Sequence, residues 1–131
     1  MNPVVHFEMP YDDSARMARF YQSAFGWQTQ LLGDEMGGYV TAATSPSGAD
    51  GRPLAPGHIH GGFFPRKPDW PAQVPSVVIA VDDIQAAMQQ VTAAGGTVLG
   101  EPMAIPGIGQ YVSFIDTEQN RVSLLQPLPR S

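Results

Sequence analysis

The chain of 131 residues contains no cysteine. Disulfide bonds, thiolate metal sites and cysteine nucleophiles are therefore excluded. Its seven Lys and Arg residues are scattered, whereas a nucleic-acid-binding surface needs them clustered. No apolar stretch approaches the length of a membrane span, and the N-terminus lacks the profile of a signal peptide. These absences predict a soluble, cytoplasmic protein with no nucleic-acid or membrane partner.

The sequence contains an internal repeat. Residues 4–27 are VVHFEMPYDDSARMARFYQSAFGW, and residues 76–97 are SVVIAVDDIQAAMQQVTAAGGT. A shift of about 70 residues places Asp12-Asp13 over Asp82-Asp83 and Gly26 over Gly96. A repeat of this length determines the fold, so it is interpreted before any single motif.

Each copy predicts a strand followed by a helix. In the first copy, apolar and polar residues alternate over residues 5–10, which is typical of a strand with one apolar face. Asp13 stands where a carboxylate caps a helix, and Gly26 where a helix commonly ends. The second copy has Asp83 as the cap and Gly95-Gly96 as the end. Apolar residues between cap and end of the first copy recur at helical spacing: Met17, Phe20, Tyr21 and Ala24.

Three strand signals follow each predicted helix. They cover residues 28–32, 39–44 and 59–64 in the first half, and 98–101, 110–115 and 122–126 in the second. We therefore expect one α+β domain of two βαβββ modules, residues 1–64 and 74–127, that form a curled, cup-shaped mixed sheet with helices on the outer face. The proline-rich segment 65–73 would be a stiff linker. Residues 45–57, rich in Gly and Pro, would form a loop at the mouth of the groove between the modules, and residues 100–109 contain a second loop.

Two segments, HFEMPYDDSARMARFYQSAFGW (6–27) and IPGIGQYVSFIDTEQNRVSLLQP (105–127), resemble the vicinal oxygen chelate superfamily. Its members include glyoxalase I, bleomycin-resistance proteins, extradiol dioxygenases and fosfomycin-resistance enzymes. The resemblance implies paired βαβββ modules whose sheets form a cup, and often a homodimer, in some members with exchanged modules. It is carried by these residues: His6, Asp13, Phe20-Tyr21, Phe25-Gly26, and the turn Asp116, Glu118 and Asn120.

In enzymes of this superfamily, the first and last strands of each module supply the ligands of a divalent metal. The resemblance places His6 at one such position, Ser76 at its repeat equivalent, and Ser123 where metalloenzymes of this type carry Glu. The fourth position falls near Gly61. Hydroxyl groups are poor ligands for these ions, so we expect no cofactor and no four-ligand metal site.

A different metal site would need His60 to face the cup. His6 and Glu8 are two residues apart in one strand and share a face. Together with His60 they could hold a metal with an open coordination position. A shift of one residue in strand register would turn His60 towards the helix instead, and the sequence leaves both orientations open.

Three functional hypotheses follow. The first is a bleomycin-resistance-type homodimer that binds a small molecule in a metal-free cup. The second is a metal-dependent lyase or isomerase that resembles glyoxalase I, in which Glu8 moves a proton at a metal-polarised substrate. The third is a metal-free enzyme whose base is the His6–Glu8 pair. The missing ligands disfavour glyoxalase I itself and a dioxygenase. The residues expected to line the cup are Tyr39, His60, Phe63, Ser76, Met103, Ile105, Tyr111 and Ser123.

Overall fold

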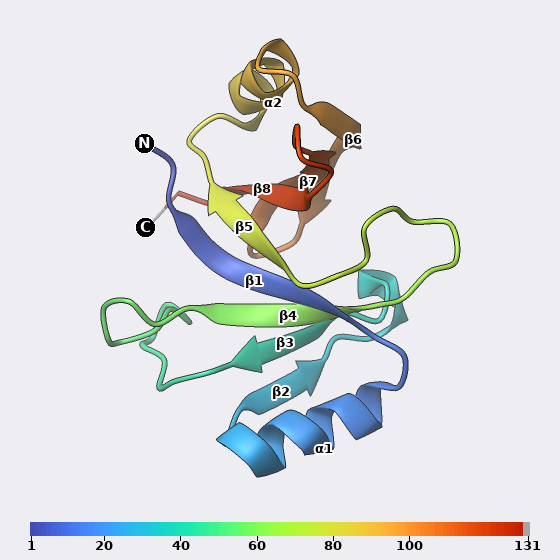
Figure 1. Ribbon diagram of the computed structural model, residues 1–131. Helices are drawn as coiled ribbons and strands as arrows, with labels where there is room; N and C mark the ends of the chain where they lie inside the picture. The colour runs from blue at the N-terminus through green and yellow to red at the C-terminus, as the bar shows by residue number, and fades with distance from the viewer. Residues whose placement is uncertain (130–131) are drawn as a thin grey trace. The chain divides into compact units, whose positions relative to one another are not determined.

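The computed structural model describes residues 1–129, which divide into two compact units (Figure 1). We call His6–Pro75 module one. Module two combines Met1–Val5 with the chain from Ser76 onward. The first residues of the chain therefore belong with the second half, and the backbone N–H of Ala80 donates to the carbonyl of Pro3 at 2.9 Å.

Module one follows the predicted order of strand, helix and three strands. Its elements are β1 (Val4–Tyr11), α1 (Ser14–Phe25), β2 (Gln28–Leu31), the short 3-10 helix η1 (Asp34–Met36), β3 (Val40–Ala43) and β4 (His60–Pro65). The strand order is β2-β3-β4-β1. β1 and β4 run parallel, and the other two pairs are antiparallel.

Helix α1 begins and ends at the predicted residues. The Asp13 carboxylate accepts from the backbone N–H of Arg16 at 3.0 Å, and Gly26 takes the left-handed conformation with φ of 76°. Met17 and Tyr21 pack against the module core, whose buried residues are Val40, Ala42 and Phe63. Phe20, which the spacing placed in the same stripe, is instead 58% exposed.

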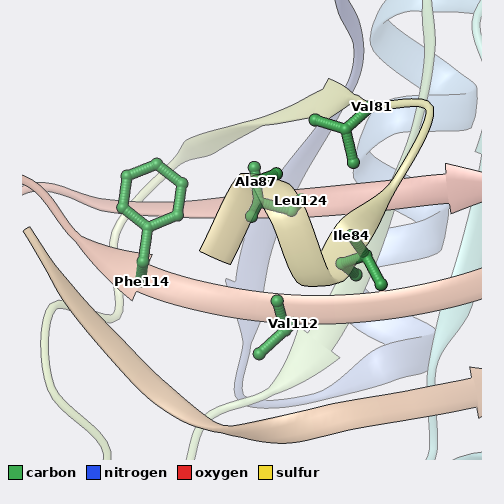
Figure 2. Close-up of a cluster of buried hydrophobic side chains, with 6 residues drawn as sticks. All are labelled: Val81, Ile84, Ala87, Val112, Phe114 and Leu124. Atoms are coloured by element: carbon green, nitrogen blue, oxygen red, sulfur yellow. The ribbon is translucent and has the colours of Figure 1, made fainter. Parts of the chain in front are cut away.

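Module two repeats the plan with a better-packed helix. It contains β5 (Ser76–Ala80), α2 (Ile84–Ala93), β6 (Thr97–Ile105), β7 (Gly109–Ile115) and β8 (Arg121–Pro127), in the strand order β5-β8-β7-β6. β5 and β8 run parallel, and the other pairs are antiparallel. Helix α2 buries Ile84 and Ala87 against the sheet (Figure 2). The remaining buried residues of this core are Val81, Val112, Phe114 and Leu124.

The predicted fold class is confirmed: α+β, with two βαβββ modules that each carry a mixed sheet and a helix. The second predicted loop is partly wrong, because β6 extends through it to Ile105. The pairing of β6 with β7 shifts between Leu99 and Met103, and Gly100 between them has a φ of 83°. A bulge of this kind lets a strand continue past residues that look like a loop in the sequence.

The segment that follows β4 is fixed to module one by its side chains. Trp70 lies with its ring centroid 6.4 Å from that of Phe64, and the Lys67 ammonium sits 4.5 Å from the Trp70 ring. Arg66 pairs with Asp12 at 3.1 Å. Within residues 1–129, no helix combines the length and the apolar character that crossing a membrane requires.

Candidate functional site

The first candidate surface is the face of the module-one sheet opposite α1. Side chains alternate along β1, so Phe7 and Met9 point towards α1 while His6 and Glu8 point the other way. His6 pairs in register with His60 on the parallel strand β4. Residues paired in this way share a face, so His60 lies on the same side as His6 and Glu8. The open question of its orientation is thereby answered.

His6 forms a partly buried hydrogen bond with a tyrosine. Its Nε2 lies 3.0 Å from the hydroxyl of Tyr39, which immediately precedes β3. Burial, and secondarily the charge of His60, lower the pKa of His6 to about 4. At neutral pH, His6 is therefore an uncharged imidazole hydrogen-bonded to the Tyr39 hydroxyl.

The position of Tyr39 depends on a glycine. A Cβ added to Gly62 would overlap the phenol ring and hydroxyl of Tyr39. Gly62 pairs with Glu8 on β1, so the phenol covers the sheet beside a carboxyl group that is only 5% exposed. The missing side chain at residue 62 is what allows Tyr39 to reach His6.

The bonds of His60 identify its tautomer. The backbone N–H of Thr44 donates to Nδ1 at 3.1 Å, so Nδ1 carries no proton. In the neutral ring the proton is therefore on Nε2, which lies 2.8 Å from the Ser47 hydroxyl. Burial also lowers the pKa of His60, so the neutral form of the ring is favoured at neutral pH. Both imidazoles of this face are therefore uncharged hydrogen-bonding groups at neutral pH.

The second candidate surface is the face of the module-two sheet opposite α2. Ser123 on β8 is 1% exposed, and its Oγ lies 2.7 Å from the Tyr111 hydroxyl and 3.0 Å from Ser113 Oγ. The Arg121 guanidinium approaches Ser113 Oγ at 3.4 Å. Ser76 belongs to the same face, because it lies two residues before Val78, which pairs with Ser123. The sequence reasoning missed Ser113, although its place two residues after Tyr111 on one strand was the available signal.

The donor positions do not fit a divalent metal. In module one they hold His6, whose Nε2 meets Tyr39, and Gly62, which has no side chain. The sequence register had placed the second position near Gly61. The parallel pairing corrects it to Gly62, because Glu8 pairs with Gly62 as Val78 pairs with Ser123. Over residues 1–129, no group of three or more His, Asp or Glu side chains is arranged to hold a metal ion. The site from His6, Glu8 and His60 considered above is therefore not formed.

One of the residues expected to line a cup lies elsewhere, and a second lies on the expected face but is mostly exposed. Phe63 points towards α1, where it is 1% exposed and its ring centroid is 5.2 Å from that of Tyr21. It is a core residue, so its assignment as a ligand-binding residue is wrong. Met103 pairs with Tyr111 and shares its face, but it is 59% exposed. The hollows beside the helices, of about 350 Å³ at α1 and 500 Å³ at α2, contain none of the candidate site residues.

Comparison with known proteins places the chain in a family. The family described as Glyoxalase/Bleomycin resistance protein/Dioxygenase superfamily matches residues 4–124. The anthracycline biosynthesis protein DnrV of Streptomyces peucetius is 33% identical over 122 residues, which cover 84% of this chain and 42% of DnrV. A glyoxylase-like domain-containing protein of Didymella fabae is 30% identical, over 86% of this chain and 84% of its own length. The chain thus spans less than half of DnrV but most of the fungal relative.

Solved structures agree with the fold. A hypothetical protein from Bacillus halodurans superimposes with a TM-score of 0.69 at 13% identity, over 99% of this chain and 97% of that one. Methylmalonyl-CoA epimerase from Mycobacterium tuberculosis gives a TM-score of 0.65 at 14% identity, over 96% and 88%. At such identities the likeness establishes the fold alone. Together with the family match over residues 4–124, it shows that this chain belongs to the glyoxalase, bleomycin resistance protein and dioxygenase superfamily.

Proposed function

We propose that this chain binds a small, uncharged organic molecule through the sheet face opposite α1, without a metal ion. The observation that carries the proposal is the His6–Tyr39 pair, 3.0 Å apart, in which a neutral imidazole is held by a phenol. Small-molecule sites combine aromatic side chains with a few placed polar groups, and this face places the Tyr39 ring beside the His6 and His60 imidazoles. A cytoplasmic homodimer is part of the proposal, supported by the exposed Phe20 and Phe25 of α1.

The state of His6 supports binding over proton transfer. A general base works best when its pKa lies near the working pH. The pKa of His6 is lowered to about 4, so the ring is a weak base at neutral pH. It remains a good hydrogen-bonding group for a carbonyl or hydroxyl of a ligand. This favours the binding hypothesis over a metal-free enzyme that uses His6 as its base.

The relatives suggest a first ligand class. DnrV carries the name of an anthracycline biosynthesis protein, and anthracyclines are fused-ring hydroxyquinones. A planar ring system can stack on the aromatic ring of Tyr39, and its hydroxyl and carbonyl groups can form hydrogen bonds with the neutral imidazoles beside that ring. We therefore choose quinizarin, a dihydroxyanthraquinone, as the probe. Propionyl-CoA is the anionic comparison, because related folds were solved with CoA esters.

The test is equilibrium binding of quinizarin to untagged protein. The dissociation constant should rise roughly fivefold in Tyr39→Phe, because one neutral hydrogen bond contributes about 1 kcal/mol. Thr92→Val is the matched control: it removes a hydroxyl from α2 of module two that donates to the Met88 carbonyl at 3.1 Å, and it should leave the affinity unchanged. A dissociation constant equal in wild type and Tyr39→Phe would refute the proposed site.

Elemental analysis separates this proposal from the metal-dependent lyase or isomerase that would use His6 and Glu8. Chelator-treated and untreated protein should bind quinizarin equally. A stoichiometric divalent metal in the untagged protein, whose removal abolishes activity and whose return restores it, would establish the alternative instead.

A further inference from the structure

The connection between β3 and β4 is folded on itself. We call residues 45–59 the strap. Ser47 and Pro53 form a β-bridge, and the backbone N–H of Leu54 donates to the Pro46 carbonyl at 3.0 Å. The N–H of Gly48 donates to the Arg52 carbonyl at 2.8 Å. These internal bonds give the strap a structure of its own, so it can move as a unit.

The ring of His60 joins the strap to the sheet. Its Nδ1 accepts from the backbone of Thr44, where the strap leaves β3, and its Nε2 bonds the Ser47 hydroxyl inside the strap. The Thr44 hydroxyl also donates to the carbonyl of Ile59, where the strap returns to β4. The two ends of the strap are thus tied at its base, and the His60 ring also bonds Ser47 further along the strap.

His60 is also next to the proposed binding site. It pairs in register with His6 on β1, and His6 bonds Tyr39. The hydroxyl of Ser47, the two imidazoles and the hydroxyl of Tyr39 therefore form one continuous row across this end of the module-one sheet. A movement of the strap at Ser47 would change access to that row.

We propose that the strap is a movable cover, latched by the Ser47–His60 bond, and that release of the latch opens the His6–Tyr39 end of the module-one face. One hydrogen bond between half-exposed groups is a weak attachment, so the strap can open locally while the module remains folded. The proposal concerns access to the site of the proposed function, but its test uses no ligand. The two can therefore fail separately.

Amide hydrogen exchange tests the latch. Ser47→Ala removes the hydroxyl of an exposed side chain, so the fold should remain intact. Exchange at the Thr44 amide, which bonds His60, should accelerate roughly fivefold, as expected when one hydrogen bond is lost. The Gly48 and Leu54 amides, whose bonds lie within the strap, should not change if the strap moves as a unit. The amides of Val40 and Ala42 in the β3 core should not change. Thr41→Val, which removes a β3 hydroxyl outside the strap, should leave all five amides as in wild type.

Chemical modification tests the opening. Diethylpyrocarbonate acylates unprotonated imidazoles, and the modification of each histidine can be followed by peptide mass spectrometry. N-acetylhistidine added to each sample serves as the reference. In Ser47→Ala, the rates at His60 and His6 relative to N-acetylhistidine should both rise roughly fivefold. Unchanged exchange at Thr44 would overturn the latch, and faster exchange with an unchanged rate at His6 would overturn its role as a cover.

Discussion

The two modules share one βαβββ plan but differ in how their helices are packed. Helix α2 buries Ile84 and Ala87 within a core of six buried residues. Helix α1 buries none of its residues, and it leaves Phe20 and Phe25 58% and 64% exposed. The same order of strands and helix therefore gives a helix packed into a hydrophobic core in module two, and a helix with an exposed aromatic surface in module one.

The modules also differ on the faces opposite their helices. Module one carries imidazoles and a phenol, whereas module two carries hydroxyls around Ser123 together with the Arg121 guanidinium. The position equivalent to Gly62 in module one is Ser123 in module two. The repeat thus preserves the residues that set strand, cap and helix, while the residues that determine chemistry have diverged.

The largest expected effect concerns the core of module two. Ile84 is 1% exposed, and Ile84→Ala should lower the free energy of unfolding by about 2–5 kcal/mol, because it creates a cavity. In protein diluted until it is monomeric, Phe20→Ala in α1 should cost less than about 1 kcal/mol, because the Phe20 ring of the single chain is mostly in water. Urea denaturation of both variants measures the difference. Equal losses in the monomer would show that α1 is packed as tightly as α2.

The second effect is acid sensitivity between pH 6.5 and 4, which should arise in module one because all three histidines lie there. The pKa of His6 is lowered from 6.5 to about 4 in the folded state, so between these values the unfolded chain binds a proton that the folded chain does not. Stability is therefore fully present above about pH 6.5 and falls as the pH is lowered to 4, by up to about 3 kcal/mol.

The pH dependence can be assigned to His6 and His60 by substitution. His6→Gln should remove the larger part of the fall in unfolding free energy between pH 6.5 and 4, and His60→Gln the smaller part, because burial lowers the pKa of both rings. Urea denaturation across this interval measures both variants. An unchanged slope in His6→Gln would place the acid-sensitive group elsewhere.

The fold could be predicted because its signals are local. Asp13 and Asp83 are recognisable caps, Gly26 a recognisable end, and alternation marks the strands. The length of β6 could not be predicted, because Gly100 and Pro102 suggest a loop in sequence. The pairing with β7, which keeps the strand going past a bulge, depends on residues far along the chain.

The candidate site was only half predictable, because it depends on strand register. Alternation within β1 placed His6 and Glu8 on one face, whereas Ser76 came from the repeat register and Ser123 from the family resemblance. His60, Phe63 and the Gly61 alignment depended on how β4 pairs with β1, which the sequence did not determine. The bond between His6 and Tyr39 joins residues 33 positions apart, so no local pattern announces it.

The smallest expected effect concerns Gly62, the residue of module one that is equivalent to Ser123 of module two. It tests whether the absence of a side chain at residue 62 is needed for the His6–Tyr39 bond. A Cβ at residue 62 would overlap Tyr39, so Gly62→Ala should displace the phenol and break its bond with His6. The expected loss is about 1–3 kcal/mol of unfolding free energy, measured by urea denaturation. Tyr39→Ala removes the ring that collides, so adding Gly62→Ala to it should cost less than Gly62→Ala alone.

The double-mutant cycle of these substitutions isolates the contact. A coupling energy of at least about 1 kcal/mol between residues 39 and 62 would show that glycine is required at residue 62 because the Tyr39 ring occupies the space of a side chain. Additive losses would instead mean that Gly62 is required by the strand itself. In that case module one would have glycine at residue 62, where module two has Ser123, because of backbone packing. The His6–Tyr39 pair would then no longer explain this difference between the modules.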